Sequence, residues 1–586
     1  MRNRSLYILA SALVLTLIAV GAFAVWRLHF APNNEMAVPF DQPGTRLVMG
    51  GDVIESDDPP ILQEGQILLP FDTIKAYIDP YIWYDEMLQK ITITTKDRVV
   101  RMKTGSLEAL VNEKPMELTF PAVSENGALY LPIDFLRDFY GITVRYMPVH
   151  DVVVVDDKNT AFRTAWPLDA RTVVRKGMSI REPIIRKFEG QGDKDLTIVR
   201  STENILIVFG ENEEWYKVRD YEGAVGYVKK KEVEVSDFQQ PDSSQVREEP
   251  PKLSEGKINL IWDMTYSKRN IELSQNSTPG IDVISPTWFE IVDSNGKIKN
   301  RAEPEYIAYA HQNGWQVWAL FSNNFSDIEG TSLILNNTDK RQAVIREILA
   351  YAALYKLDGI NVDFENVYKK DRDAYTQFIR EFYPLAKEQG LFVSVDVTVP
   401  DGSDNWSKCF DRKALGESVD YVCLMTYDQH WSTSPKAGST AELVWVEENI
   451  QKTLREVPAD KLLLGIPLYT RLWTEAVVDG ESTVSSKALN ITSAWKEIED
   501  NDAIVAWSDL SGQYQASYDK DGKTYKMWLE DADAVNMKTS LVHKYNLSGA
   551  CIWAANFADE QVFVVLERNM KQISGYEDWE SYYMSK

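Results

Sequence analysis

From residue 257 onward, short apolar runs alternate with longer stretches whose apolar residues recur at helical spacing. A strand buried on both faces of a parallel sheet is a nearly continuous apolar run, whereas a helix needs about ten residues or more. Eight apolar runs separated by helix-sized intervals predict an α/β fold, a (β/α)8 TIM barrel, over residues 257–570. The predicted strands are Ile258–Trp262, Val283–Pro286, Gln316–Phe321, Gly359–Phe364, Phe392–Val397, Tyr421–Met425, Leu462–Ile466 and Ala550–Ala554.

Residues 45–157 have a different, β-rich pattern that contains a repeat. Leu69-Pro70-Phe71-Asp72 recurs as Leu131-Pro132-Ile133-Asp134, 62 positions later, and a helix-like stretch and a β-branched strand follow each copy. Two copies of a strand–helix–strand unit predict one small α+β domain. The region resembles the copper amine oxidase N-terminal-like stalk domain of bacterial surface proteins. That resemblance implies no copper, because the region holds a single histidine.

Residues 164–235 contain short strands broken by glycines and acidic turns, which predict a small β-barrel. Trp215–Arg219, followed by Gly223 and Gly226-Tyr227-Val228, resembles the end of a bacterial SH3-like domain. The resemblance implies contact with cell wall or peptide, and a spacer with an ordinary core tryptophan is the alternative. Residues 236–256 are polar and contain prolines, which predicts a linker.

Residues 1–30 have the pattern of a targeting segment. Arg2 and Arg4 precede 22 uncharged residues, Ser5–Trp26. A helix of that length spans roughly 33 Å, enough to cross a bilayer core. We therefore expect a single-pass transmembrane helix in the cell membrane, with the rest of the chain outside. The alternative is a cleaved signal peptide and a secreted protein, because Ala22-Phe23-Ala24 has the small-x-small form of a cleavage site.

Charge and composition exclude several classes of partner. The chain has 63 Lys and Arg against 88 Asp and Glu, a net charge of −25, so we expect no nucleic-acid partner. Three cysteines form no disulfide framework, and five scattered histidines lack the spacing of metal ligands. We therefore expect neither a metal nor a cofactor.

Candidate chemistry lies on the fourth predicted barrel strand, in Asp358-Gly359-Ile360-Asn361-Val362-Asp363-Phe364-Glu365. Side chains alternate between the two faces of a strand, so Asn361, Asp363 and Glu365 share one face. Polar groups, two of them acids, are costly to bury in a parallel barrel strand without a purpose. A buried ion-pair network is the alternative to a functional site.

This segment resembles the DGxDxDxE signature that glycoside hydrolase family 18, the chitinase-like family, carries on its fourth barrel strand. Met425-Thr426-Tyr427-Asp428 resembles the family's MxYD at the end of the sixth strand, and Leu464–Tyr469 resembles LGIPxY of the seventh. Trp553 ends the eighth strand, as in the family. The segment from Gly512 to Asp531 resembles a small α+β insertion of many members, here placed at about 474–535.

The resemblance implies roles for these residues. The family uses substrate-assisted catalysis, in which the substrate's 2-acetamido oxygen attacks the anomeric carbon. Glu365 is then the general acid, Asp363 orients the acetamido N–H, and Tyr427 donates its hydroxyl to the acetamido oxygen. The substrate-binding residues implied are Asn361, Asp428, Trp553, Met425 and Tyr469. Trp553 is the apolar floor under the sugar, with core filling as the alternative.

Two departures from the family pattern concern the site. Asn361 stands where the family has its middle Asp, so the usual exchange of hydrogen-bond partner between two aspartates cannot occur in its normal form. The third strand, Trp318–Asn324, lacks the family's SxGG. Both features resemble the branch that contains spore-cortex and cell-wall glucosaminidases. We expect Asn361→Asp to move the alkaline limb of the pH–rate profile upward; otherwise Asn361 only holds Asp363 by a hydrogen bond.

Together these patterns predict an extracytoplasmic retaining glycosidase that hydrolyses β-1,4 bonds of N-acetylglucosamine-containing polymers, with peptidoglycan as the expected polymer. Two alternatives are a chitinase acting on chitin or chitooligosaccharides and a catalytically silent protein that binds wall sugars. The acid at Glu365 favours an enzyme.

Overall fold

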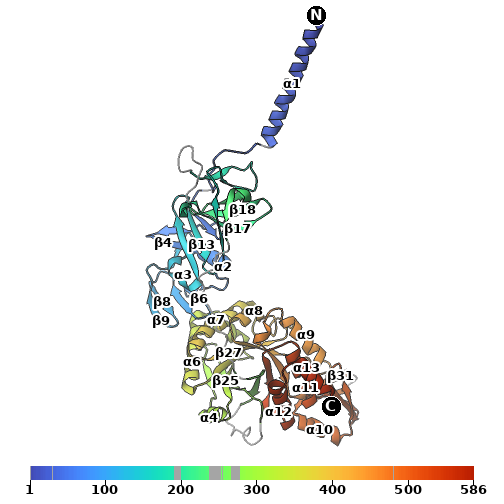
Figure 1. Ribbon diagram of the computed structural model, residues 1–586. Helices are drawn as coiled ribbons and strands as arrows, with labels where there is room; N and C mark the ends of the chain where they lie inside the picture. The colour runs from blue at the N-terminus through green and yellow to red at the C-terminus, as the bar shows by residue number, and fades with distance from the viewer. Residues whose placement is uncertain are drawn as a thin grey trace. The chain divides into compact units, whose positions relative to one another are not determined.

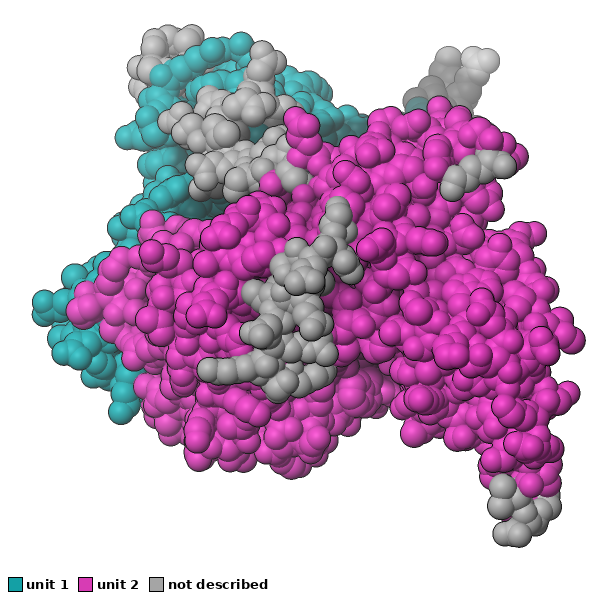
Figure 2. Space-filling model, turned by 90° about the horizontal axis from the view of Figure 1, so that it is seen from below, with its two compact units in different colours: residues 1–82, 102–109, 116–247 teal, residues 83–101, 110–115, 248–586 magenta. Residues whose placement is uncertain are grey.

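A computed structural model describes most of the chain, which divides into two compact units (Figure 2). Unit 1 contains residues 1–82, 102–109 and 116–247, and unit 2 contains residues 83–101, 110–115 and 248–586. The predicted linker, 236–256, lies almost entirely outside the described residues. The described residues are 2–29, 31–41, 43–189, 200–236, 253, 255–265, 278–478 and 481–585.

Unit 2 is built around a closed barrel of eight parallel strands, which confirms the predicted barrel (Figure 1). Strand β22 pairs with both β21 and β25, and β35 pairs with both β29 and β21, so the ring has no free edge. The strands are β21 (Ile258–Asp263), β22 (Val283–Pro286), β25 (Gln316–Ser322), β26 (Gly359–Asp363), β27 (Phe392–Thr398), β28 (Tyr421–Met425), β29 (Leu462–Pro467) and β35 (Gly549–Trp553).

Helices cover the outside of the barrel and bury its apolar outward face (Figure 1). The α-helices whose buried residues join this core are α4 (Pro304–Gln312), α5 (Ile328–Leu335), α6 (Thr338–Tyr355), α7 (Arg372–Glu388), α8 (Arg412–Glu417), α9 (Leu443–Thr453), α11 (Ala532–Lys544) and α12 (Glu560–Glu567). Outward residues of β26, such as Ile360 and Val362, are fully buried beneath them. The apolar half of the alternation on β26 therefore packs the core and leaves the polar half for the barrel interior.

The first two residues of the fourth-strand motif anchor the strand. A Cβ on Gly359 would lie 2.7 Å from Trp318 Cδ1 and 2.8 Å from the Phe392 carbonyl oxygen, so only glycine fits there. The Asp358 carboxylate accepts a 2.8 Å hydrogen bond from the Val317 N–H and lies 2.8 Å from His311 Nε2. These two residues fix β26 against β25 and leave the chemistry to the positions that follow.

A separate sheet lies between β29 and α11. Its five antiparallel strands have the order β31-β30-β34-β33-β32, and helix α10 (Ile491–Asp500) packs with them around a core of their own. The insertion thus extends from 470 to 528, close to the predicted 474–535. Its strands are β30 (Thr470–Val478), β31 (Glu481–Leu489), β32 (Ile504–Ser508), β33 (Gln513–Lys520) and β34 (Lys523–Trp528).

Two segments from the predicted stalk region, 83–101 and 110–115, group with the barrel in unit 2. They include β5 (Trp83–Asp85), β6 (Lys90–Thr94) and part of β7 (Val99–Lys103). The Asp85 carboxylate accepts the Thr338 N–H at 2.9 Å, at the first turn of α6 where a negative charge is favourable.

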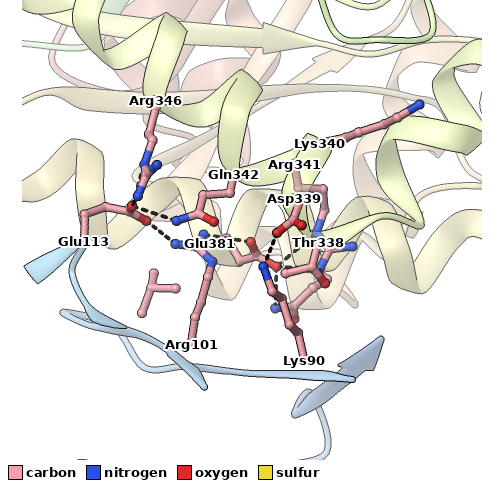
Figure 3. Close-up of polar contacts among 12 residues, drawn as sticks. Lys90, Arg101, Glu113, Thr338, Asp339, Lys340, Arg341, Gln342, Arg346 and Glu381 are labelled. Carbon is pink, nitrogen blue, oxygen red and sulfur yellow. Dashed lines mark hydrogen bonds and ion pairs between the residues drawn. The ribbon is translucent and has the colours of Figure 1, made fainter. Parts of the chain in front are cut away.

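Arg101 from these segments reaches a buried carboxylate on α7. Its Nη2 donates to Glu381 Oε2 at 2.9 Å, and Arg341 Nε of α6 donates to Glu381 Oε1 at 3.0 Å (Figure 3). The Glu381 and Arg341 side chains are fully buried and Arg101 is 5% exposed. A shared, desolvated ion cluster therefore holds part of the predicted stalk domain to the barrel helices.

The internal repeat forms a symmetric strand pair in unit 1. Strand β4 (Gln66–Pro70) leads into α2 (Phe71–Tyr77), and β11 (Ala128–Pro132) leads into α3 (Ile133–Tyr140). The two strands pair antiparallel with Leu131 opposite Leu69, and both leucines are fully buried. The two copies of the repeat thus pair with one another at their Leu-Pro dipeptides.

The predicted SH3-like region forms a seven-stranded antiparallel sheet with the order β16-β15-β19-β18-β17-β14-β20. Trp215, at the start of β18, is buried, as in the spacer alternative. The strands are β14 (Arg163–Pro167), β15 (Val173–Arg175), β16 (Ile184–Lys187), β17 (Leu206–Glu211), β18 (Trp215–Asp220), β19 (Val225–Lys229) and β20 (Val233–Val235).

The predicted transmembrane segment forms a helix, α1 (Arg2–His29). Among the residues that the structure describes, however, none of the helices combines the length and the apolar character needed to cross a membrane. The predicted membrane-spanning helix is therefore not supported.

Candidate active site

A cavity of about 990 Å³ opens at the C-terminal ends of the barrel strands, where the site was expected. It brings together seven of the eight predicted site residues: Asp363, Glu365, Met425, Tyr427, Asp428, Tyr469 and Trp553. The remaining predicted residue, Asn361, is fully buried beneath them and is not part of the cavity wall.

Glu365 is held by its backbone. Its N–H donates to Asn323 Oδ1 at 2.9 Å, and its carbonyl oxygen accepts from Asn323 Nδ2 at the same distance. Asn323 follows β25, in the segment where the family has SxGG, and is itself buried. Burial, the Asp363 charge and then the Asp428 charge raise the pKa of the Glu365 carboxyl well above its ordinary value. The group therefore keeps its proton at a pH where an exposed glutamate has lost it.

Asp363 lies two residues before Glu365, on the same face of β26 and deeper in the barrel. Its Oδ1 is buried and has no hydrogen-bond partner among the described residues. Burial raises the pKa of Asp363 well above its ordinary value, and the charge of Asp396 raises it further. An unpaired buried carboxylate oxygen is costly, so this atom is available to a donor that enters the cavity.

Asn361 is bonded on both ends of its amide. Its Oδ1 accepts from Trp262 Nε1 at 2.8 Å, while its Nδ2 donates to Ser394 Oγ at 2.9 Å and to Asp396 Oδ1 at 2.7 Å. None of the hydrogen bonds found among the described residues joins Asn361 to Asp363. The amide nitrogen thus donates to the neighbouring strand β27, and the amide oxygen accepts from β21.

Tyr427 and Asp428 follow β28, as the MTYD motif predicted. Burial raises the pKa of the Tyr427 hydroxyl well above its ordinary value, so the phenol remains a donor. Asp428 Oδ1 accepts from the Tyr469 hydroxyl at 2.6 Å and from Arg471 Nη2 at 2.8 Å. These two partners come from the end of β29 and the start of the insertion, and they fix the carboxylate at the rim.

Trp553 supplies an aromatic wall. Its ring meets that of Trp262 edge to face, with centroids 5.8 Å apart, and the tryptophan is only partly buried. Because Trp262 is held by Asn361, the tryptophan pair and the polar network support one another. Met425 lines the same cavity.

Sequence reasoning missed several residues in this cavity. Asp396 on β27 lines it, and a signal was present, because Ser394, Asp396 and Thr398 alternate with valines as the polar residues of β26 do. Two exposed tryptophans, Trp406 and Trp431, come from the loops after β27 and β28. Loop aromatics have no periodic pattern, so no sequence signal placed them here.

One group among the described residues has the make-up of a metal site. Ligand atoms of His150, Asp220 and Glu222 in unit 1 lie within 4.8 Å of one another. However, Arg186 Nη1 lies 2.8 Å from Asp220 and 3.7 Å from Glu222. The guanidinium already pairs with both carboxylates, so we assign no ion to this group.

Sequence models of three families match the chain. The model of the glycosyl hydrolases family 18 matches residues 265–558, half of the chain. That of the copper amine oxidase N-terminal domain matches residues 48–155, and that of the bacterial SH3 domain matches residues 205–234. The three resemblances inferred from the motifs are thereby confirmed.

Individual proteins are similar to parts of this chain. The uncharacterized glycosylase YvbX of Bacillus subtilis (strain 168) is 27% identical over 290 residues, which are 48% of this chain and 82% of that protein. The cortical fragment-lytic enzyme of the same organism is 30% identical over 251 residues, 42% of this chain and 57% of that enzyme. The crystal structure of the Bacillus megaterium QM B1551 spore cortex-lytic enzyme SleL aligns with a TM-score of 0.49 at 21% identity, over 60% of this chain and 78% of that one.

Proposed function

Because the chain belongs to the glycosyl hydrolases family 18, we propose that it hydrolyses β-1,4 bonds of an N-acetylglucosamine-containing polymer with retention of configuration, and that this polymer is peptidoglycan. As a member of the family, it is a glycoside hydrolase. One observation carries the proposed mechanism: a buried Asp363 oxygen without a partner lies beside a carboxyl group, Glu365, whose pKa is raised.

Glu365 acts as the general acid. A carboxyl group with a raised pKa delivers its proton to the glycosidic oxygen near neutral pH, and the resulting carboxylate activates water in the second step. General acid catalysis contributes roughly 10²–10⁴-fold. The Asn323 clamp on the Glu365 backbone fixes where that proton is delivered.

Asp363 and Tyr427 position the substrate's acetamido group. The free Asp363 oxygen accepts the acetamido N–H and opposes the positive charge that develops as the acetamido oxygen attacks the anomeric carbon. The neutral Tyr427 hydroxyl donates to that oxygen and directs it. Trp553 provides the apolar face on which the sugar ring stacks.

Peptidoglycan is the proposed polymer for two reasons. The chain carries an SH3-like domain of a bacterial type, and a cortical fragment-lytic enzyme is among its relatives. Exposed Trp406 and Trp431 line the same cavity as Glu365 and Trp553, and several aromatic side chains in one cavity suit a polymer longer than one sugar unit.

The proposal includes a place of action outside the cytoplasm. Arg2 and Arg4 precede the uncharged run Ser5–Trp26, which is typical of segments that direct export. Protease added to intact cells should then digest the protein while a cytoplasmic marker survives. Survival of both would contradict export.

Product analysis tests the polymer and the reaction together. Purified protein is incubated with peptidoglycan sacculi and, separately, with chitooligosaccharides, and the products are identified by mass spectrometry. We expect fragments of peptidoglycan with N-acetylglucosamine at the new reducing end, and the β-anomer first by NMR. Cleavage of chitooligosaccharides alone would identify a chitinase. Binding to sacculi without any new reducing ends would identify a silent binding protein.

A further inference from the structure

Asp396 is an acid of the site that lies on β27, outside the fourth-strand motif. In the register of β26 and β27, Asn361 lies opposite Ser394 and Val362 opposite Val395, so Asp363 and Asp396 are the next neighbours along the same two strands. Adjacent parallel strands lie about 4.8 Å apart, so the two inward carboxyl groups are neighbours, and the charge of Asp396 acts on Asp363. Both side chains are buried and both line the cavity.

The hydrogen bonds around the two acids are unequal. Asp396 Oδ1 accepts from Asn361 Nδ2 at 2.7 Å, whereas Asp363 Oδ1 has no partner among the described residues. A donor favours the ionised form of a carboxyl group, and a buried oxygen without a donor favours the protonated form. Of the two acids, Asp396 is therefore the one that carries the negative charge and Asp363 the one that carries the proton.

We propose that Asp396 is the partner carboxyl of Asp363, that the two groups hold one proton between them, and that Asp396 takes this proton when Asp363 accepts the substrate's acetamido N–H. The last step rests on the proposed function. The proton leaves an Asp363 oxygen and arrives on an Asp396 oxygen, so the pair carries one negative charge before and after. Asp396 acts through Asp363 and is a positioning residue.

The pair of Asp363 and Asp396 explains how the site holds a second acid although Asn361 replaces the family's middle aspartate. An amide at 361 cannot exchange a proton with Asp363, and it does not bond to Asp363 here. Instead it orients the acid on the next strand. The second acid of the site has thus moved from β26 to β27, with Asn361 as its donor.

The other titratable groups around the pair do not supply this proton. Burial raises the pKa values of Tyr427, Tyr375 and Cys423 well above their ordinary values, and that of Cys551 as well, so all four stay neutral between pH 4 and pH 8. Glu365 also titrates with a raised pKa, first through burial and then through Asp363. Burial, then Cys423, raise the pKa of Asp396 itself.

The first test needs no substrate, because a buried shared proton links folding to pH. The folded pair keeps a proton that the unfolded chain has released above about pH 4, so stability falls as pH rises from there through the pair's upper pKa. Asp396→Asn leaves one carboxyl with an intermediate pKa, so above pH 5 its melting temperature should fall less with pH than that of the wild type.

Ser394→Ala is the matched control. Ser394 is buried and accepts from the same Asn361 amide nitrogen, but it does not titrate. Its melting temperature should change with pH in the same way as that of the wild type. If the melting temperature of Asp396→Asn also followed the wild-type pH dependence, the proposed shared proton would be refuted. If Asp396→Asn does not fold, the double variant Asn361→Asp/Asp396→Asn takes its place, because it moves the second carboxyl back to β26. Its melting temperature should then fall with pH as steeply as that of the wild type. A melting temperature that does not depend on pH would refute the shared proton.

The second test connects the pair to turnover. In the wild type, kcat/KM falls at low pH when the pair binds a second proton. Because the pair already holds one proton, the second binds only at low pH. In Asp396→Asn the acid limb of kcat/KM reports a single buried Asp363, so the limb should move to higher pH by about one unit. It should stay in place in Ser394→Ala, and an unmoved limb in both variants would overturn the catalytic role. If the wild type hydrolyses no substrate, the proposed function fails, and the melting curves alone still decide the pair.

Discussion

Arg101 offers a sharp test of which residues make up the catalytic unit. It lies about 150 residues before the barrel in sequence, yet its guanidinium is 5% exposed and donates to the fully buried Glu381 at 2.9 Å. Arg101→Met keeps the apolar stem and removes the charge. Glu381 then retains Arg341 and Gln377 on Oε1, both at 3.0 Å, while Oε2 loses the arginine that faced it.

Removing one partner from a buried ion pair costs about 3–5 kcal/mol, and we expect about 3 kcal/mol here because Arg341 remains. For a unit of this size that corresponds to a fall of about 4 °C in melting temperature. Lys114→Met is the matched control from the other stalk-region segment of unit 2, 110–115. Lys114 pairs with Glu388 at 2.5 Å, but both side chains are largely exposed, so its loss should cost about 1 kcal/mol or less.

Thermal unfolding of the full chain, followed by calorimetry, measures both variants. Burial would raise the pKa of Glu381, but Arg341 and Arg101 outweigh burial and hold it below the ordinary value. The stability from the ionised carboxylate is therefore present above about pH 4.3 and lost as pH falls through the folded pKa. The deficit of Arg101→Met should narrow as pH falls below about 4.3. Equal effects of Arg101→Met and Lys114→Met would refute the reasoning, and 83–101 would then not belong to the catalytic unit.

Two further predictions concern the site. Asn361→Asp places an oxygen where Nδ2 donates to Asp396 at 2.7 Å, so the two carboxyls must share a proton; we expect a loss of stability that grows above pH 5 and an alkaline limb moved upward by about one unit. Thermal unfolding and rate profiles across pH measure it, and a pH-independent loss would speak against it. Tyr427→Phe removes the donor to the acetamido oxygen and should lower kcat about 10²–10³-fold with little change in KM. Steady-state kinetics check this, and a change confined to KM would contradict it.

The barrel could be predicted from sequence because its strands are apolar runs that differ from their surroundings. Val283–Pro286 and Tyr421–Met425 were predicted with their observed bounds, and the other strands differ by one residue at an end or, for the eighth, at both ends. The site followed from the same alternation, since inward polar residues on β26 stand out against a buried strand. Asp396 shows the limit of reasoning from a motif: its alternating pattern on β27 was readable, but no family motif pointed to it.

Contacts across long sequence separations could not be predicted. Arg101 and Glu381 are 280 residues apart, and neither has a sequence pattern that names its partner. Asn323 clamps Glu365 from 42 residues away and replaces a family motif with a different side chain. Such pairs depend on the packing of whole elements, which hydrophobic periodicity does not encode.

The most direct test of the central claim is the turnover of Glu365→Gln. The amide fills the same space and keeps the Asn323 clamp on the backbone, but it cannot deliver a proton. We expect hydrolysis of the polymer to fall by about 10⁴-fold, because the same group acts in both steps, while binding to it is nearly unchanged. A variant that retains more than about a tenth of wild-type turnover would contradict Glu365 as the acid, since general acid catalysis contributes at least about 10²-fold.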